Sequence, residues 1–87
     1  MIAVYPGTFD PITNGHFEII RRASTLFETL VVAVASSPEK SPLFDIDERL
    51  NMVNEVLNAF SNIEVKKYSG LTINFAKQSD AHVIVRG

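Results

Sequence analysis

The chain has 87 residues, which is enough for one small hydrophobic core and too few for two. Its formal net charge of −2 provides no broad positive surface for nucleic acid or anionic lipid, and the lack of cysteine excludes disulfides and thiolate chemistry. The longest apolar run, residues 30–35, is far shorter than a membrane span. We therefore expect a cytoplasmic protein that binds neither nucleic acid nor membrane.

The first thirty residues have the pattern of a strand, a loop and a helix. Residues 2–5 form a short apolar run that ends at Pro6-Gly7, as expected for a buried strand that enters a turn. After the loop, apolar side chains recur at helical spacing: Ile19, Ile20, Ala23, Leu26 and Phe27. This spacing predicts an amphipathic helix.

The remaining elements continue the alternation. Residues 30–35 are apolar throughout and rich in valine, which is typical of a strand covered on both faces of a parallel sheet. After a loop rich in proline and serine, Asp45 stands three residues before Glu48, a capping-box spacing that predicts a second helix. We expect a third strand at 63–65, a short helix at 71–77 and a fourth strand at 82–85.

The order β-α-β-α-β-α-β predicts an α/β fold with a Rossmann-like parallel sheet and right-handed connections. The sequence reaches Arg86-Gly87 directly after a hydrophobic strand, with no helix to cover it. We therefore expect residues 1–87 to be the N-terminal portion of a domain that is truncated after its fourth strand, or a chain whose missing layer comes from a partner.

Residues of the strand-to-helix loops are candidates for ligand binding. Open α/β sheets bind ligands beyond the carboxyl ends of their strands. Thr8 follows the first strand, Lys40 lies in the loop after the second, and Arg86 follows the fourth, so all three are expected at one edge of the sheet. By composition alone Lys40 is by default a solvated charge and Arg86 a surface ion-pair partner, and their expected place at one edge of the sheet favours binding.

The start of the first helix is a candidate phosphate site. Its amides are unpaired and carry partial positive charge, Gly15 would let a ligand approach the backbone, and His16 could supply an imidazole donor. A lone histidine near a helix start is more often a cap or a surface residue. The chain lacks both the Gly-Lys-Ser/Thr run and the Gly-x-Gly-x-x-Gly fingerprint of the common nucleotide folds.

The segment "YPGTFDPITNGH" resembles the signature of the nucleotidyltransferase superfamily, whose motif His/Thr-x-Gly-His stands here as Thr13-Asn14-Gly15-His16. Threonine in the first position, with proline before Gly-Thr-Phe-Asp, is similar to the phosphopantetheine adenylyltransferase family. The segments "SSPEKSPLF", "LFDIDER" and "VIVRG" extend this resemblance over the whole chain.

The resemblance implies transfer of AMP from ATP to 4'-phosphopantetheine, giving dephospho-coenzyme A and pyrophosphate, by direct attack on the α-phosphorus. It implies that His16, Lys40 and Arg86 are catalytic and that Asp10 braces the loop. The residues that it places on ATP are Thr8, Phe9, Gly15 and His16. Those that it places on 4'-phosphopantetheine are Thr8, Lys40, Leu71, Asn74 and Arg86. Mg²⁺ would bridge the phosphates, with no metal ligands from the protein.

Members of the resembled family are nearly twice as long, and their later segments contribute to the adenine pocket and hold the outer phosphates of ATP. The resemblance also implies a homo-oligomer, a hexamer in the bacterial enzymes, with coenzyme A as a possible feedback ligand. One alternative is an inactive half-fold that binds phosphate ligands, self-associates and needs a complementary segment for turnover. A superfamily member with another acceptor is a second alternative, against which Thr13 argues.

Overall fold

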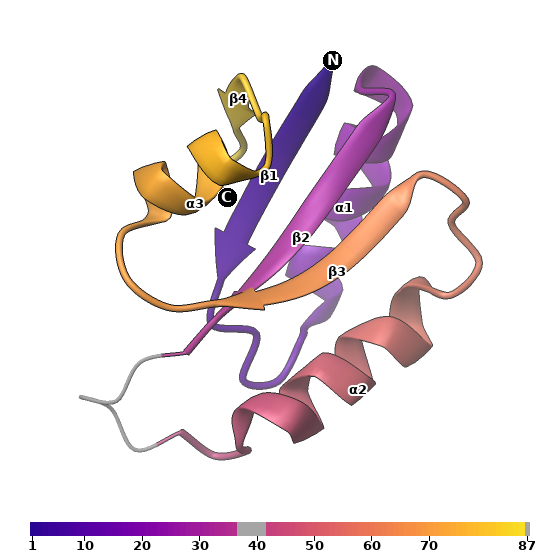
Figure 1. Cartoon of the computed structure of the whole chain (residues 1–87). Helices are drawn as coiled ribbons and strands as arrows, with labels where there is room; N and C mark the ends of the chain where they lie inside the picture. Colours follow the sequence, from indigo (N-terminus) through magenta and orange to yellow (C-terminus); the bar gives the residue numbers. More distant parts are fainter. Residues whose placement is uncertain (37–41, 87) are drawn as a thin grey trace.

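The structure, a computed structural model, describes residues 1–36 and 42–86 (Figure 1). In this part of the chain, four strands alternate with three helices: β1 (Ile2–Gly7), α1 (Asn14–Leu26), β2 (Thr29–Ala35), α2 (Ile46–Leu57), β3 (Ile63–Tyr68), α3 (Thr72–Gln78) and β4 (Val83–Ile84). The strands form one parallel sheet in the order β3-β2-β1-β4. The predicted α/β class and element order are therefore confirmed.

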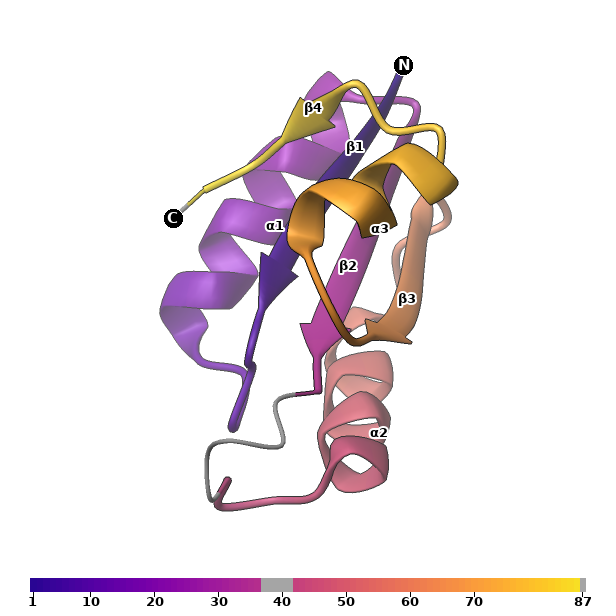
Figure 2. The same ribbon diagram turned by 60° about the vertical axis from the view of Figure 1, so that its left-hand side comes forward.

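The helices cover both faces of the sheet because the chain reverses direction within it. From β1 to β3 each strand is added on the same side, and the chain then crosses back to place β4 on the other side of β1. Right-handed connections consequently put α1 and α2 on one face and α3 on the other. Figure 2 shows α1 and α3 on opposite sides of β1 and β2. The expectation that residues 30–35 are covered on both faces is correct.

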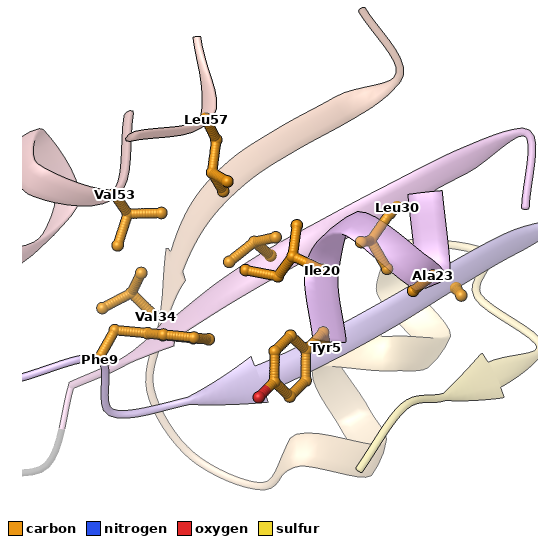
Figure 3. Close-up of a cluster of buried hydrophobic side chains, with 10 residues drawn as sticks. Tyr5, Phe9, Ile20, Ala23, Leu30, Val34, Val53 and Leu57 are labelled. Atoms are coloured by element: carbon orange, nitrogen blue, oxygen red, sulfur yellow. The ribbon is translucent and has the colours of Figure 1, made fainter. Parts of the chain in front are cut away.

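The larger core lies between the sheet and the α1/α2 layer. Figure 3 shows Ile20 and Ala23 of α1, and Val53 and Leu57 of α2, directed toward alternate side chains of β1 and β2. The strand residues of this cluster are Ala3, Tyr5, Leu30, Val32 and Val34. The opposite face has a smaller cluster of Val4, Val31 and Ala33, against which Phe75 and Ala81 pack. The two clusters lie on opposite faces of the sheet, because successive side chains of a strand point to alternate faces.

Some strand boundaries differ from the prediction. β1 continues through Pro6 and Gly7, where a turn was expected. Proline is tolerated here because of the way the backbone of β1 is oriented. The N–H and C=O groups of its even-numbered residues are directed at β4, as the bond from Val85 N–H to the Val4 carbonyl shows. β4 pairs only with Ala3 and Val4. Pro6 therefore lies beyond the last rung, where no ladder bond needs its missing N–H.

The later elements are shifted by a few residues. β3 reaches Tyr68 instead of residue 65, because its pairing with β2 continues to Ala35. β4 is shorter than predicted, and α3 begins one residue later than expected. Among the described residues, no helix is both long and apolar enough to cross a membrane.

Truncation of Ile20 measures the importance of the larger core. Ile20 is fully buried, so we expect Ile20→Val to lower the free energy of unfolding by about 1 kcal/mol, through loss of one methylene and the small cavity that remains. Ile73→Val is the matched control: this side chain is 57% exposed, and a change below about 0.5 kcal/mol is expected. Urea unfolding of both variants is the measurement, and equal losses would contradict the assignment of the core.

Candidate functional site

The segment after β1 turns inward around Phe9. The Phe9 ring is buried, and its centroid lies 5.5 Å from that of Tyr5 and 4.8 Å from that of His16, in edge-to-face geometry. Figure 3 shows this ring beside Val34 among the core side chains. The Phe9 backbone has a φ of 47°, a left-handed conformation that costs a non-glycine residue about 1–2 kcal/mol. Burial of the ring offsets this cost and fixes the loop.

Gly7 makes the inward position of Phe9 possible. A Cβ at residue 7 would lie 3.0 Å from two atoms of the Phe9 ring, closer than side chains normally pack. A larger residue there would displace the ring and the backbone of the loop with it. The glycine that ends β1 is therefore required by close approach, whereas Gly15 has only the Thr13 hydroxyl near its Cβ position, at 3.6 Å.

The first turn of α1 is closed by a reciprocal pair of hydrogen bonds. Thr13 is the N-cap: its Oγ1 accepts from the backbone N–H of His16 at 3.3 Å. In return, the backbone N–H of Thr13 donates to Nδ1 of His16 at 3.0 Å. This is a capping box in which histidine replaces the usual glutamate or glutamine. Burial lowers the pKa of the His16 imidazole below its ordinary value of 6.5.

Arg49 of α2 connects three segments at the carboxyl edge of the sheet. The side chain is only 3% exposed. Its Nη1 donates to the carbonyls of Thr8 and Ala35, at 2.8 and 2.9 Å, and its Nε donates to the carbonyl of Phe44 at 3.0 Å. A buried guanidinium thus holds together the loop after β1, the end of β2 and the approach to α2.

Asp10 connects the same loop to the segment before α2, but as a hydrogen-bond acceptor. Its carboxylate accepts from the backbone N–H of Leu43 at 2.6 Å and of Phe44 at 2.9 Å. Charge-assisted bonds of this kind are stronger than neutral ones. Asp10 therefore braces the loop against the segment that leads into α2, which is the part that the sequence analysis expected it to play.

The other candidate residues lie around the start of α3 and the end of β4. Leu71 and Asn74 are exposed and line one cavity of about 400 Å³, together with Tyr68 and Phe75. Arg86 lines a second cavity of about 320 Å³ with Pro6 and Thr72. The two cavities flank the Leu71–Thr72 junction, and the second reaches the end of β1.

The predicted residues are thus partly brought together. Phe9 and His16 are in contact, and Leu71 and Asn74 share a cavity. Thr8 is exposed, and its carbonyl is held by Arg49. Lys40 lies outside the described residues. Within residues 1–36 and 42–86, no group of three or more His, Cys, Asp or Glu is arranged to hold a metal ion.

Two residues that shape the site were missed by the sequence analysis. Arg49 stands three residues after Ile46 and four before Val53, so the helical stripe placed it on the buried face, although a charged residue is ordinarily expected in solvent. Phe9 was named only as a residue that holds ATP, and the burial of its side chain was not predicted. Its signal is an aromatic residue in a loop otherwise rich in glycine and proline.

Solved structures superpose on most of this chain. The chain superposes on nicotinic acid mononucleotide adenylyltransferase of Plasmodium falciparum with a TM-score of 0.74 and 26% identity, covering 91% of this chain and 44% of that one. A lipopolysaccharide core biosynthesis protein of Thermoplasma volcanium has a TM-score of 0.74 at 22% identity, over 97% and 71% of the two chains, and shows the fold alone. The fold is the Rossmann-like fold of nucleotidyltransferases.

The sequence matches the profile of the Cytidylyltransferase-like family over residues 4–87, and the chain belongs to that family. It is homologous to phosphopantetheine adenylyltransferases along its whole length. It is 56% identical to that of Carboxydothermus hydrogenoformans over 86 residues, and 54% identical to that of Thioalkalivibrio sulfidiphilus over 87. These matches cover 99% and 100% of this chain but 53% and 55% of the relatives, so the chain spans about half their length.

Replacement of Arg49 by lysine tests the connection between the three segments. Lysine keeps the charge but cannot donate to three separate carbonyls in the fixed geometry of a guanidinium. Because at least one part-buried carbonyl is left without its charged donor, we expect Arg49→Lys to lower the free energy of unfolding by about 1–3 kcal/mol. Arg22→Lys, at a side chain that is 75% exposed, should stay within about 0.5 kcal/mol. If urea unfolding gave similar losses of unfolding free energy for both variants, the hydrogen bonds of the Arg49 guanidinium would not contribute to stability.

The lowered pKa of His16 predicts a pH dependence of stability. The unfolded chain binds the imidazole proton more tightly, so this contribution to stability is complete above pH 6.5 and is lost as the pH falls through the lower pKa of the folded state. His16→Gln keeps a residue that can complete the capping box and should flatten this part of the curve. His82→Gln should leave it in place. Thermal unfolding between pH 5 and 8 measures how stability changes with pH. This pH dependence must differ between the two variants.

Proposed function

We propose that this chain provides the phosphate-binding half of an enzyme that transfers an adenylyl group from ATP to 4'-phosphopantetheine, giving dephospho-coenzyme A and pyrophosphate. The observation that carries the proposal is the 56% identity with a phosphopantetheine adenylyltransferase over nearly the whole chain. It is supported by the start of α1 at Thr13-Asn14-Gly15-His16, placed beside the loop that follows β1.

In this reaction, an oxygen of the 4'-phosphopantetheine phosphate attacks the α-phosphorus of ATP in line. A new P–O bond forms to the attacking oxygen, the bond from the α-phosphorus to the bridging oxygen breaks, and pyrophosphate leaves with the electron pair. No group on the protein needs to become covalently attached. The contribution of the protein is positioning and electrostatic stabilisation of the developing charge.

His16 donates a hydrogen bond to an α-phosphate oxygen of ATP, aided by the backbone of Thr8, Phe9 and Gly15. The fixed φ of Phe9 and the buried ring beneath His16 support this assignment, because both hold the donors before the ligand arrives. A helix N-terminus adds partial positive charge toward the same oxygens.

Thr8, Lys40 and Arg86 hold the phosphate of 4'-phosphopantetheine, and Leu71 and Asn74 contact its pantetheine arm. The cavity lined by Pro6 and Arg86 also includes Thr72, the neighbour of Leu71 in the cavity lined by Leu71 and Asn74. An elongated substrate with a phosphate at one end fits this pair of openings. His16, Lys40 and Arg86 are the catalytic residues of this proposal.

Mg²⁺ is expected to enter with the phosphates of ATP, because the described residues offer no cluster of carboxylates or imidazoles for it. It would supply neutralisation of phosphate charge. The proposal also includes a cytoplasmic location, a homo-oligomer that is a hexamer in the resembled bacterial family, and coenzyme A as a possible feedback ligand.

The alternative is a half-fold that binds phosphate ligands but turns over only with a complementary segment. It is favoured by one observation, namely that the chain spans about half of the curated relatives that it matches. It predicts binding of 4'-phosphopantetheine without pyrophosphate release, and self-association in sedimentation experiments. Pyrophosphate release by the 87-residue chain alone would exclude it.

Calorimetric titration with 4'-phosphopantetheine tests the substrate site. Loss of one charge-assisted phosphate contact costs about 1.5–3 kcal/mol, so Arg86→Ala should weaken binding about 10- to 100-fold. Arg22→Ala removes an exposed arginine from α1 and should bind as the unmodified chain does. Separate titration with ATP and an assay of pyrophosphate complete the experiment. Equal affinities for the two variants would remove Arg86 from the site, and no binding of either ligand would contradict the proposed function.

A further inference from the structure

The side chain of His16 has a hydrogen-bonding pattern that a helix cap alone does not need. In a capping box, the third residue of the helix only has to accept a bond from the N-cap amide, and glutamate or glutamine does so with one oxygen. The imidazole accepts that bond with Nδ1 and still has a second nitrogen on the same rigid ring. A histidine at this position therefore offers a function in addition to the cap.

Two groups of Thr13 are directed at the same nitrogen. The backbone N–H of Thr13 lies 3.0 Å from Nδ1, and the Thr13 hydroxyl lies 3.1 Å from it. An amide N–H can only donate, so Nδ1 must offer its lone pair. The hydroxyl oxygen already accepts from the His16 amide, which leaves its hydrogen free to point toward Nδ1 as well.

The state of the ring follows from these contacts. A neutral imidazole with an accepting Nδ1 carries its hydrogen on Nε2, whereas protonation of Nδ1 would set its hydrogen against the amide hydrogen of Thr13. The rings that face the imidazole reinforce this preference. Phe9 is apolar, and Tyr5 of β1 is neutral near pH 7, because the ordinary pKa of a phenol is about 10 and burial raises that of Tyr5 further.

We propose that Thr13 is a positioning residue that holds His16 as a neutral imidazole with its hydrogen on Nε2, presented as a donor to a phosphoryl oxygen. The inference rests on the proposed function only in naming the acceptor. Thr13 thus has two roles. It caps α1 through Oγ1, and it determines which nitrogen of His16 can donate a hydrogen bond.

The substitution Thr13→Asp separates the two roles of this residue. Aspartate is at least as good an N-cap as threonine and still accepts from the His16 amide, so the helix is retained. Its carboxylate has no hydrogen to donate to Nδ1, and its negative charge favours the doubly protonated ring. We expect the titration midpoint of His16 in this variant to rise by about one pH unit. Thr13→Ser retains the hydroxyl and should behave as the original residue does.

The measurement is long-range ¹H–¹⁵N correlation NMR of the chain labelled with ¹⁵N-histidine, without ligand, across the pH range 5–8. His82, the other histidine, is the internal reference, because within the described residues its ring makes no hydrogen bond. We expect Nδ1 of His16 to give a pure acceptor resonance and Nε2 a pure donor resonance, in contrast to the averaged resonances of His82.

At the high-pH end of the series, where the ring is neutral, a His16 signal averaged between tautomers like that of His82, or a proton on Nδ1, would overturn the proposal. So would a Thr13→Asp variant that remains folded by circular dichroism and titrates like the original chain, since that is the behaviour of a residue that only caps. The readout requires no ligand. Failure of ATP or 4'-phosphopantetheine to bind would therefore count against the proposed function and leave this result unaffected.

Discussion

The buried guanidinium of Arg49 is the constraint on which the carboxyl edge of the sheet depends. A charge that is 3% exposed needs hydrogen-bond partners, because an unpaired buried charge costs several kcal/mol. Its three acceptors are carbonyls of segments far apart in the sequence, at Thr8, Ala35 and Phe44. The planar fork fixes where these carbonyls lie relative to one another. The loop after β1 is therefore positioned from α2, with Asp10 adding bonds in the opposite direction.

The position of the loop after β1 in turn determines the position of the His16 side chain through packing. Because the Thr8 carbonyl is held, the next residue turns its ring into the core, and Gly7 leaves the space that the ring needs. The Phe9 ring then supports the imidazole of His16 from one side, while Thr13 holds Nδ1 from another. The position of the imidazole is thus determined by a strand end, a buried aromatic ring and a helix cap together. A substitution at Gly7 should act on His16 although the two residues are nine positions apart.

The elements of the fold were predictable because their patterns are local. Apolar runs, helical spacing and the Asp45–Glu48 capping box predicted the order of the strands and helices that the described residues form, and that capping box is present. Strand ends were less predictable, since the extension of β3 to Tyr68 depends on pairing with β2, and the short β4 on its two pairs with β1. At the candidate site, the sequence indicated which loops matter. The hydrogen bonds of Arg49 and the packing of Phe9 could not be read from the sequence, because both depend on partners supplied by other elements.

The proposed phosphate site contrasts with phosphate sites that rely on a high density of positive charge. The chain has a net charge of −2, and the charge of Arg49 is directed at carbonyls of its own backbone. Among the described residues at this edge, the groups proposed to meet an anion are backbone amides, a helix N-terminus, the imidazole of His16 and the exposed Arg86. Most of these are fixed dipoles, which stabilise developing charge without reorganising when the reaction occurs. Such a site selects its ligand by geometry, because a dipole weakens with misalignment far more steeply than a free charge does. The structural connections made by Arg49, Phe9 and Thr13 are then what a phosphate site of this kind requires.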